Sequence, residues 1–153
     1  MKHVTRSLEE THALAAKFIQ TVRDGVSNSG AVVFGMYGDL GSGKTAFVQG
    51  VAKALGVEHQ ITSPTFVIQK RYPISEPHST LHNLHSIIHI DAYRFADGKD
   101  MKALRWEETL SDPGNIVFLE WADIVESASP ENLIPLKFKF IDETTREIEL
   151  PEW

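Results

Sequence analysis

Apolar residues recur along this chain in two patterns. Segments 31–37, 87–91 and 116–120 are short and almost continuously apolar, which is typical of strands covered on both faces of a parallel sheet. Segments 8–24 and 45–55 instead carry apolar residues three and four positions apart, which predicts helices with one buried face. Strands and helices therefore alternate along the chain, and this order predicts an α/β fold.

The remaining segments are predicted to form the edge strands of the sheet, one further helix and a surface loop. Alternating apolar and polar residues in the second half of 61–72 indicate a strand, and the same alternation in 136–140 and 146–150 indicates an antiparallel hairpin at the edge of the sheet. Segment 101–110 has the composition of one helix that packs on the sheet. The polar segment 73–86 is predicted to be a long surface connection without regular structure.

The composition narrows the class of protein. With 153 residues, of which 42% are hydrophobic, the chain is predicted to form one domain over residues 1–153. The absence of cysteine excludes disulfides, thiolate nucleophiles and cysteine-based metal sites. No segment has the apolar length of a signal peptide or a membrane span, so we expect a cytoplasmic protein with no membrane partner. A net charge of −6 disfavours direct binding of nucleic acid, so any such role is expected to run through a partner.

A glycine-rich segment between the first apolar strand and the following helix carries the clearest chemistry. It has the spacing of a P-loop, in which backbone N–H groups point at phosphate oxygens. Lys44 is expected to bridge the β- and γ-phosphates. Thr45 is expected to offer its hydroxyl to Mg²⁺ at a helix N-terminus whose dipole favours anions. The segment consists of Gly38, Asp39, Leu40, Gly41, Ser42, Gly43, Lys44 and Thr45.

The alternative interpretation of this segment is a glycine-rich turn that fits the motif by chance. Its context favours the P-loop, because buried strand, loop and helix follow one another in the order that a P-loop requires. The predicted fold is therefore a P-loop NTPase-type sheet with a largely parallel centre and antiparallel C-terminal edge strands, flanked by helices.

Two carboxylates directly follow the other two apolar strands. Ligands of open α/β sheets bind at the carboxyl ends of the strands, so Asp91 and Glu120 are expected beside the P-loop. Glu120 follows the longer apolar run and resembles a Walker B acid, which makes it the candidate for the magnesium shell. Asp91 is then predicted to orient water or to make a second metal contact. Either acid alone could instead be a solvated strand end.

A turn before the strand predicted in 61–72 adds a further hydroxyl. Pro64 fixes its own φ and pushes Ser63 toward an extended backbone, so 63–65 is predicted to be a defined turn. Thr65 is then a candidate second hydroxyl that faces the nucleotide or the metal. The alternative is an ordinary loop before an edge strand.

Taken together, these motifs resemble the TsaE (YjeE) family, the small P-loop ATPase of bacterial tRNA threonylcarbamoyladenosine biosynthesis. The resemblance spans most of the chain. It rests on Thr11 in the first helix, the P-loop, Ser-Pro-Thr-Phe at 63–66, His-x-Asp-x-Tyr-Arg at 89–94 and Glu-Trp at 120–121. It implies ATP hydrolysis coupled to the TsaB and TsaD proteins, which carry the threonylcarbamoyl transfer, so that tRNA is reached only indirectly through that complex.

The resemblance also implies roles for individual residues. Lys44 would bind phosphate, Thr45 and Glu120 would hold Mg²⁺, and Asp91 would support hydrolysis. The catalytic set implied in this way is Lys44, Asp91 and Glu120. Outside the P-loop, the residues expected to contact ATP or ADP are Thr11, Thr65, which would lie in a switch-like loop, and Trp121.

The predicted function is thus Mg²⁺-dependent ATP hydrolysis that is slow in the isolated chain. An arginine beside the transferred phosphate typically raises the rate by about a thousandfold or more, and Arg94 is the one obvious candidate in the sequence. Partners are therefore expected to accelerate the reaction. Two alternatives use the same motifs: a small-molecule P-loop kinase, in which Asp91 accepts a proton from a substrate hydroxyl, and a nucleotide-dependent scaffold whose hydrolysis is incidental.

Overall fold

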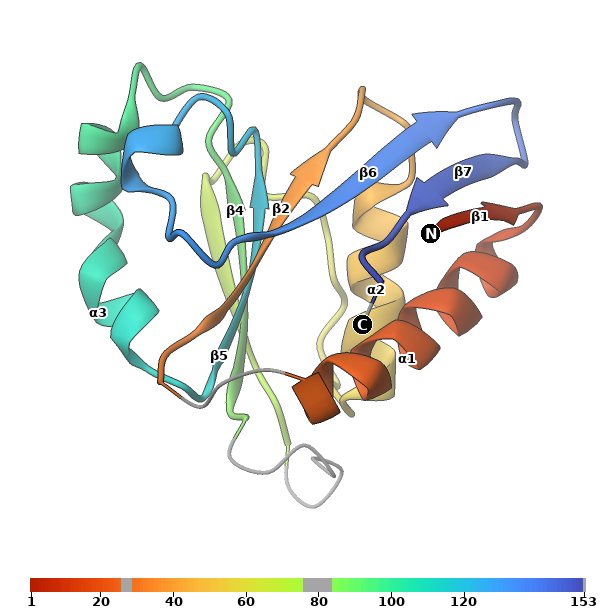
Figure 1. The fold of residues 1–153 in the computed structure, drawn as a ribbon, viewed down its shortest axis with the longest axis horizontal. Coiled ribbons are helices and arrows are strands. Elements are labelled where there is room, and N and C mark those ends of the chain that lie inside the picture. Colours follow the sequence, from red (N-terminus) through yellow and green to blue (C-terminus); the bar gives the residue numbers. More distant parts are fainter. Residues whose placement is uncertain (26–28, 76–83, 153) are drawn as a thin grey trace.

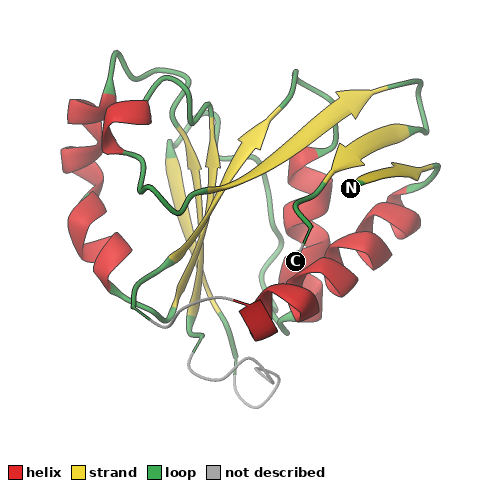
Figure 2. Ribbon diagram, in the orientation of Figure 1, coloured by secondary structure: helices red, strands yellow, loops and turns green. Residues whose placement is uncertain are grey.

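The computed structural model describes residues 1–25, 29–75 and 84–152, which form one sheet with helices on both faces (Figures 1 and 2). The strands lie in the order β1-β7-β6-β2-β5-β4-β3. Their bounds are β1 Lys2–Thr5, β2 Val32–Tyr37, β3 Gln69–Pro73, β4 Ser86–Asp91, β5 Asn115–Glu120, β6 Ile134–Phe140 and β7 Arg146–Glu149. The helical elements are α1 Leu8–Gly25, α2 Lys44–Ala54, η1 Gly98–Leu104, α3 Trp106–Ser111 and η2 Glu126–Ala128.

The centre of the sheet is parallel and its margins are antiparallel. β6, β2, β5 and β4 run in the same direction. β3 pairs antiparallel with β4 at one margin, and β7 pairs antiparallel with β6 at the other. The predicted fold class is therefore confirmed, including the C-terminal hairpin.

The first strand, β1, is a feature that the sequence pattern does not predict. It pairs antiparallel with β7, so the hairpin is flanked by β1 on its outer side and by β2 on its inner side. Of its four residues, Thr5 alone is buried. A strand with a single buried residue has no apolar alternation by which to recognise it.

Each face of the sheet contributes to a separate hydrophobic core, because successive residues of a strand point to opposite faces. On β4, Ile87 belongs to the core beneath α1 and α2, whereas Ile88 belongs to the core that includes Met101 of η1. In the first core, the ring of Phe34 lies 5.4 Å from that of Phe18. The parallel strands all end at the edge of the sheet from which α2 starts.

The helix predicted over 101–110 is interrupted. η1 ends at Leu104, Arg105 adopts a left-handed backbone with φ of 53°, and α3 starts at Trp106. The change of direction turns the indole of Trp106 into the second core, where its Nε1 donates a hydrogen bond to the Ala128 carbonyl at 2.7 Å. Packing of one tryptophan therefore overrides the helical propensity of the segment.

The region around β3 follows the prediction in part. The strand expected in the second half of 61–72 starts at Gln69, after a turn in which Ile68 has a φ of 68°. The connection predicted over 73–86 starts at the end of β3, but residues 76–83 lie outside the described part of the chain. None of the helices in the described residues has the length and apolarity needed to span a membrane.

Candidate nucleotide-binding site

The glycine-rich loop joins β2 to α2 and requires glycine at its two ends. Gly38 has a φ of 149°, and a Cβ at this position would lie 2.4 Å from the Phe138 carbonyl oxygen of the neighbouring strand. Gly43 has a φ of 103° and precedes the first residue of α2. Side chains at either position would strain the loop. The geometry leaves the N-terminus of α2 facing the cavity, where its dipole favours an anion.

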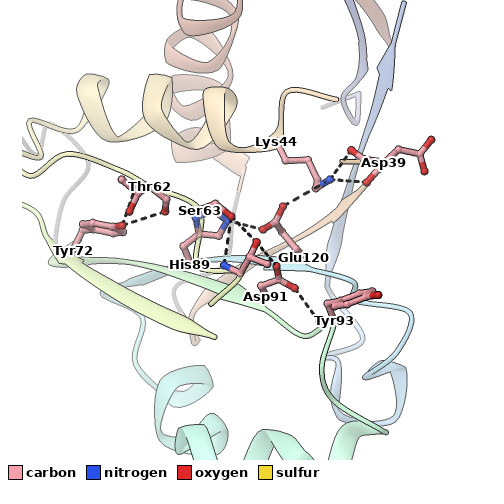
Figure 3. A network of polar contacts seen from close by, with 11 residues as sticks. Asp39, Lys44, Thr62, Ser63, Tyr72, His89, Asp91, Tyr93 and Glu120 are labelled. Carbon is pink, nitrogen blue, oxygen red and sulfur yellow. Dashed lines mark hydrogen bonds and ion pairs between the residues drawn. The ribbon is translucent and has the colours of Figure 1, made fainter. Parts of the chain in front are cut away.

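Lys44 lies across this loop with its amine turned toward the loop's own backbone (Figure 3). Its Nζ donates hydrogen bonds to the carbonyls of Gly38 at 2.6 Å and Asp39 at 3.0 Å. It also lies 3.8 Å from Oε1 of Glu120. The amine is therefore held at the loop by acceptors that a phosphate oxygen could replace.

The two predicted acids lie side by side, as expected from their places at the ends of β4 and β5. Asp91 and Glu120 are register partners in the parallel ladder, and each residue is only 5% exposed. Asp91 accepts hydrogen bonds from the backbone N–H of Tyr93 at 2.9 Å and from the Thr65 hydroxyl at 3.0 Å. Its carboxylate is thus fixed on both oxygens.

Glu120 differs from its neighbour in what surrounds its oxygens. Among the described residues, none donates a hydrogen bond to its carboxylate, and its nearest nitrogen-bearing side chains are those of Lys44 and His89. Oε2 lies 3.4 Å from Nε2 of His89. Of the two acids, Glu120 therefore has the carboxylate that remains available to a ligand.

The turn that carries Thr65 reaches the acids from the other side. The hydroxyls of Ser63 and Thr65 lie 2.7 Å apart, and Thr65 continues this contact to Asp91. The backbone N–H of Asp91 donates to the carbonyl of Ile68 at 2.8 Å, which closes the turn onto β4. Thr65 and Asp91 are thus joined although 26 residues separate them.

These groups enclose a cavity of about 640 Å³ at the carboxyl ends of β2, β4 and β5. This volume is in the range of small-molecule sites. Most of the predicted site residues line it. They are Asp39, Leu40, Gly41, Gly43, Lys44, Thr45, Thr65, Asp91, Glu120 and Trp121, joined by Ala46, Ser63 and Tyr93.

A family model matches residues 5–148, which is nearly the whole chain. The family is described as threonylcarbamoyl adenosine biosynthesis protein TsaE. The chain belongs to the TsaE family. The sequence resemblance that rests on the P-loop, the two acids and the Glu-Trp pair is confirmed.

Individual relatives extend over almost the same length. The chain is 31% identical to the tRNA threonylcarbamoyladenosine biosynthesis protein TsaE of Treponema pallidum over 148 residues, covering 97% of this chain and 98% of that protein. It is 33% identical to the protein of the same name from Rickettsia bellii over 144 residues, covering 94% and 89%. The crystal structure of Bacillus subtilis YdiB superposes with a TM-score of 0.66 at 27% identity, covering 97% of this chain and 82% of that one.

Three predicted contact residues of this TsaE chain lie outside the lining of the cavity. Thr11 is buried in α1, where its hydroxyl lies 2.8 Å from that of Thr5 and donates to the Ser7 carbonyl. Gly38 contributes its carbonyl to Lys44. The hydroxyl of Ser42 is buried without a hydrogen-bond partner among the described residues.

Arg94, the arginine singled out in the sequence, is also outside the lining. It is exposed, and its guanidinium lies 5.9 Å from the ring centroid of Phe66 on the outer surface of the turn. The arginine that does contact the P-loop is Arg146, which was not predicted. Its Nε donates to the Gly41 carbonyl at 3.0 Å, and its guanidinium lies 4.6 Å above the ring of Phe140. The pairing of β7 with β6 brings it there, and no sequence motif marks it.

The donor set of this TsaE site suits a hard cation. Thr45, Asp91 and Glu120 all offer oxygen to the cavity. Among the described residues, no group of three or more His, Cys, Asp or Glu side chains is placed to hold a metal ion. Mg²⁺ commonly binds through one or two carboxylates together with phosphate oxygens and water, so these residues could hold it together with a nucleotide.

Proposed function

We propose that this TsaE chain is the ATP-binding and ATP-hydrolysing subunit of the machinery that makes threonylcarbamoyladenosine on tRNA. The observation that carries the proposal is the convergence of a P-loop lysine, a helix N-terminus and two buried carboxylates on one cavity. This set of groups matches the demands of phosphoryl transfer, which depends mainly on positioning and on charge stabilisation. Membership of the TsaE family supports the choice of pathway.

In the proposed complex, the loop and α2 bind the phosphates of ATP or ADP. Lys44 exchanges its two carbonyl acceptors for phosphate oxygens. Thr45 and Glu120 hold Mg²⁺, which supplies charge neutralisation on the transferred phosphoryl group. Asp91 lies beside Glu120 with both oxygens hydrogen-bonded, so it is positioned to orient the attacking water.

We expect hydrolysis by the isolated chain to be slow. Of the arginines in the described residues, none lines the cavity. The guanidinium of Arg94 lies over the ring of Phe66, and Arg146 donates a hydrogen bond to the Gly41 carbonyl of the loop. The charge that an arginine supplies in faster enzymes would then come from a partner, for which TsaD and TsaB are the candidates.

Exposed apolar side chains around the cavity support docking of such a partner. Leu40, which lines the cavity, is 94% exposed, and Phe66, which follows the lining residue Thr65, is 83% exposed. The rings of Tyr93 and Trp121 lie 5.2 Å apart on the same rim and are also exposed. Apolar groups gathered at one opening are typical of a protein interaction site. The negative net charge of −6 favours contact with tRNA through the partner complex over direct contact.

A single-turnover assay tests this function. ATP hydrolysis is measured with the isolated chain and with the TsaB–TsaD complex added, using wild type, Lys44→Ala and Glu120→Ala. We expect the complex to raise the wild-type rate, Lys44→Ala to lose nucleotide binding, and Glu120→Ala to lose turnover more than binding. Equal rates with and without the complex would refute partner activation, and unchanged hydrolysis in both variants would refute the site.

Complementation separates an ATPase cycle from a scaffold. A bacterium depleted of its own TsaE is supplied with each variant, and threonylcarbamoyladenosine in its tRNA is measured by mass spectrometry. We expect wild type to restore the modified nucleoside and Glu120→Ala to fail. Full restoration by Glu120→Ala would show that hydrolysis is incidental and would favour the scaffold.

A further inference from the structure

His89 is a buried imidazole that the proposed function does not yet use. It lies in β4 between Ile88 and Ile90 and is 0% exposed. Neither ring nitrogen has a hydrogen-bond partner among the described residues. Buried polar side-chain atoms are usually hydrogen-bonded, because leaving them without a partner destabilises the folded protein. A histidine retained at such a position therefore calls for an explanation.

The position of His89 relative to Glu120 supplies one. His89 and Asp91 are two residues apart on β4 and so share a face of the sheet, and Glu120 is the register partner of Asp91 on β5. This arrangement brings Nε2 of His89 to 3.4 Å from Oε2 of Glu120 (Figure 3). This distance is slightly longer than the usual N–H···O hydrogen bond, and the pair is not hydrogen-bonded in the structure. A small movement of either side chain would bring the two atoms within hydrogen-bonding distance.

The other oxygen of Glu120 faces the P-loop. Its Oε1 lies 3.8 Å from Nζ of Lys44. A phosphate in the cavity would draw Lys44 away, because phosphate oxygens are stronger acceptors than the carbonyls it now contacts. Among the described residues, the N–H of His89 would then be the one donor left near the Glu120 carboxylate. Asp91 has no such dependence, since two donors already fix it.

We propose that His89 is a positioning residue for Glu120. Its Nε2–H donates a hydrogen bond to Oε2 and directs Oε1 toward the Mg²⁺ that accompanies the nucleotide. The inference rests on the proposed nucleotide site and adds to it a residue behind the magnesium-binding carboxylate. Groups that orient a metal ligand in this way typically change metal affinity or activity by about 10–100-fold when removed.

Two substitutions distinguish this role from simple filling of the core. His89→Leu replaces the imidazole with an apolar side chain of similar volume and so removes the donor. His89→Gln places an amide N–H near the position of Nε2 and keeps the donor. A residue needed only for packing would tolerate leucine at least as well as glutamine, because the site is fully buried.

The deciding experiment measures ADP binding to the full chain by calorimetry, with and without Mg²⁺. We expect His89→Leu to reduce the gain in ADP affinity that Mg²⁺ provides by about tenfold or more, with metal-free ADP affinity unchanged. His89→Gln should retain most of the gain, and His89→Leu should cause no further loss in a Glu120→Ala background. Thermal melts of each variant confirm that it folds.

A Mg²⁺ response in His89→Leu equal to that of wild type would overturn the inference and leave the proposed function intact. So would a His89→Gln variant that folds but loses as much as His89→Leu. A wild-type chain that binds no ADP would instead overturn the proposed function itself. The outcomes are therefore distinguishable.

An NMR measurement tests the same contact without changing His89. In histidine-¹⁵N-labelled protein with Mg²⁺ and ADP, the Nε2–H of His89 should be protected from exchange with water, and Glu120→Ala should shift its resonance. Identical spectra for wild type and Glu120→Ala would refute the hydrogen bond. This arm decides the question if the His89 variants do not fold.

Discussion

The two ends of the parallel strands are built in opposite ways. At the amino ends of β4 and β5, buried Asn115 donates through Nδ2 to the Thr109 carbonyl at 3.0 Å and accepts from Arg71 through Oδ1 at 3.3 Å. Asp112 accepts from the backbone N–H of Gly114 and lies 2.9 Å from Nε2 of His85. The polar side chains at this end satisfy one another.

At the carboxyl ends of the same strands, polar groups are more deeply buried and incompletely paired. The side chains of Glu120, His89 and Ser42 have no hydrogen-bond partner within the described part of the chain. Buried polar atoms without partners lower stability. The comparison indicates that the amino end contributes to folding, whereas the carboxyl end is arranged for a ligand that completes its hydrogen bonds.

The largest effect that this contrast predicts is on nucleotide affinity. Lys44→Ala removes the amine that donates to the Gly38 and Asp39 carbonyls of the loop. Hydrogen bonds to charged groups contribute about 1.5–3 kcal/mol each, so ATP affinity should fall by about a hundredfold or more. The free energy of unfolding should change by less than about 1 kcal/mol. Calorimetric titration and urea denaturation measure the two quantities.

Lys53→Ala is the matched control for this variant, because Lys53 is an exposed lysine on the same helix. It should bind ATP as wild type does. An equal loss of affinity in both variants would show that the effect is general electrostatics and not the P-loop contact.

The second prediction concerns the amino ends of the strands, where a substitution should lower stability and leave nucleotide affinity unchanged. Asn115→Ala breaks two hydrogen bonds and leaves the Thr109 carbonyl without its side-chain donor. The free energy of unfolding should fall by about 2 kcal/mol, with ATP affinity unchanged in the folded protein. Urea denaturation measures the loss, and the exposed Asn132→Ala serves as control. A variant as stable as wild type would contradict the proposed division between the two ends.

A smaller effect is expected from the contact between the turn and Asp91. Thr65→Val keeps the shape of the side chain and removes the hydroxyl that donates to Asp91. One hydrogen bond of about 1–1.5 kcal/mol corresponds to about a tenfold lower rate of ATP hydrolysis. Thr65→Ser should retain the wild-type rate. If Thr65→Ser is as slow as Thr65→Val, the hydroxyl is not what positions the acid.

The smallest predicted effect concerns acid stability. Hydrogen bonding from Gly114 lowers the pKa of Asp112 below its usual 3.8, and His85 adds to the effect. A lowered pKa stabilises the folded state above the pKa of the unfolded chain, and this contribution is lost as pH falls below about 4. Because the side chain is 42% exposed, solvent screening limits the contribution to a few tenths of a kcal/mol.

The test compares urea midpoints of wild type and Asp112→Asn at pH 7 and pH 3. Wild type should be the more stable at pH 7, and the difference should shrink at pH 3. A difference that grows on acidification would contradict the predicted direction.

The fold and the loop could be predicted because their signals are local. A buried parallel strand is apolar throughout, and the residues of the P-loop are consecutive, so both are visible in a short window of sequence. The placement of Asp91 and Glu120 beside the P-loop also followed from a general rule about strand ends. None of these predictions requires the register between particular strands.

The features that the sequence did not reveal depend on such pairing. Arg146 reaches Gly41 only because β7 pairs with β6 beside the loop. His89 lies near Glu120 only because β4 and β5 are in their observed register. The break at Arg105 follows from the packing of Trp106, which the helical propensity of its neighbours does not encode. Residues within a sequence motif could therefore be predicted, whereas contacts that depend on the register between strands could not.

The position of β2 in the sheet also has a consequence for how the protein is made. Its neighbours are β5 and β6, where Val32 pairs with Ile116 and Phe34 with Ile134. Contacts between residues so far apart in sequence form slowly. During synthesis, the strand that leads into the P-loop stays without either neighbour until most of the chain has left the ribosome. A nucleotide bound as proposed would therefore stabilise the protein only at a late step of folding.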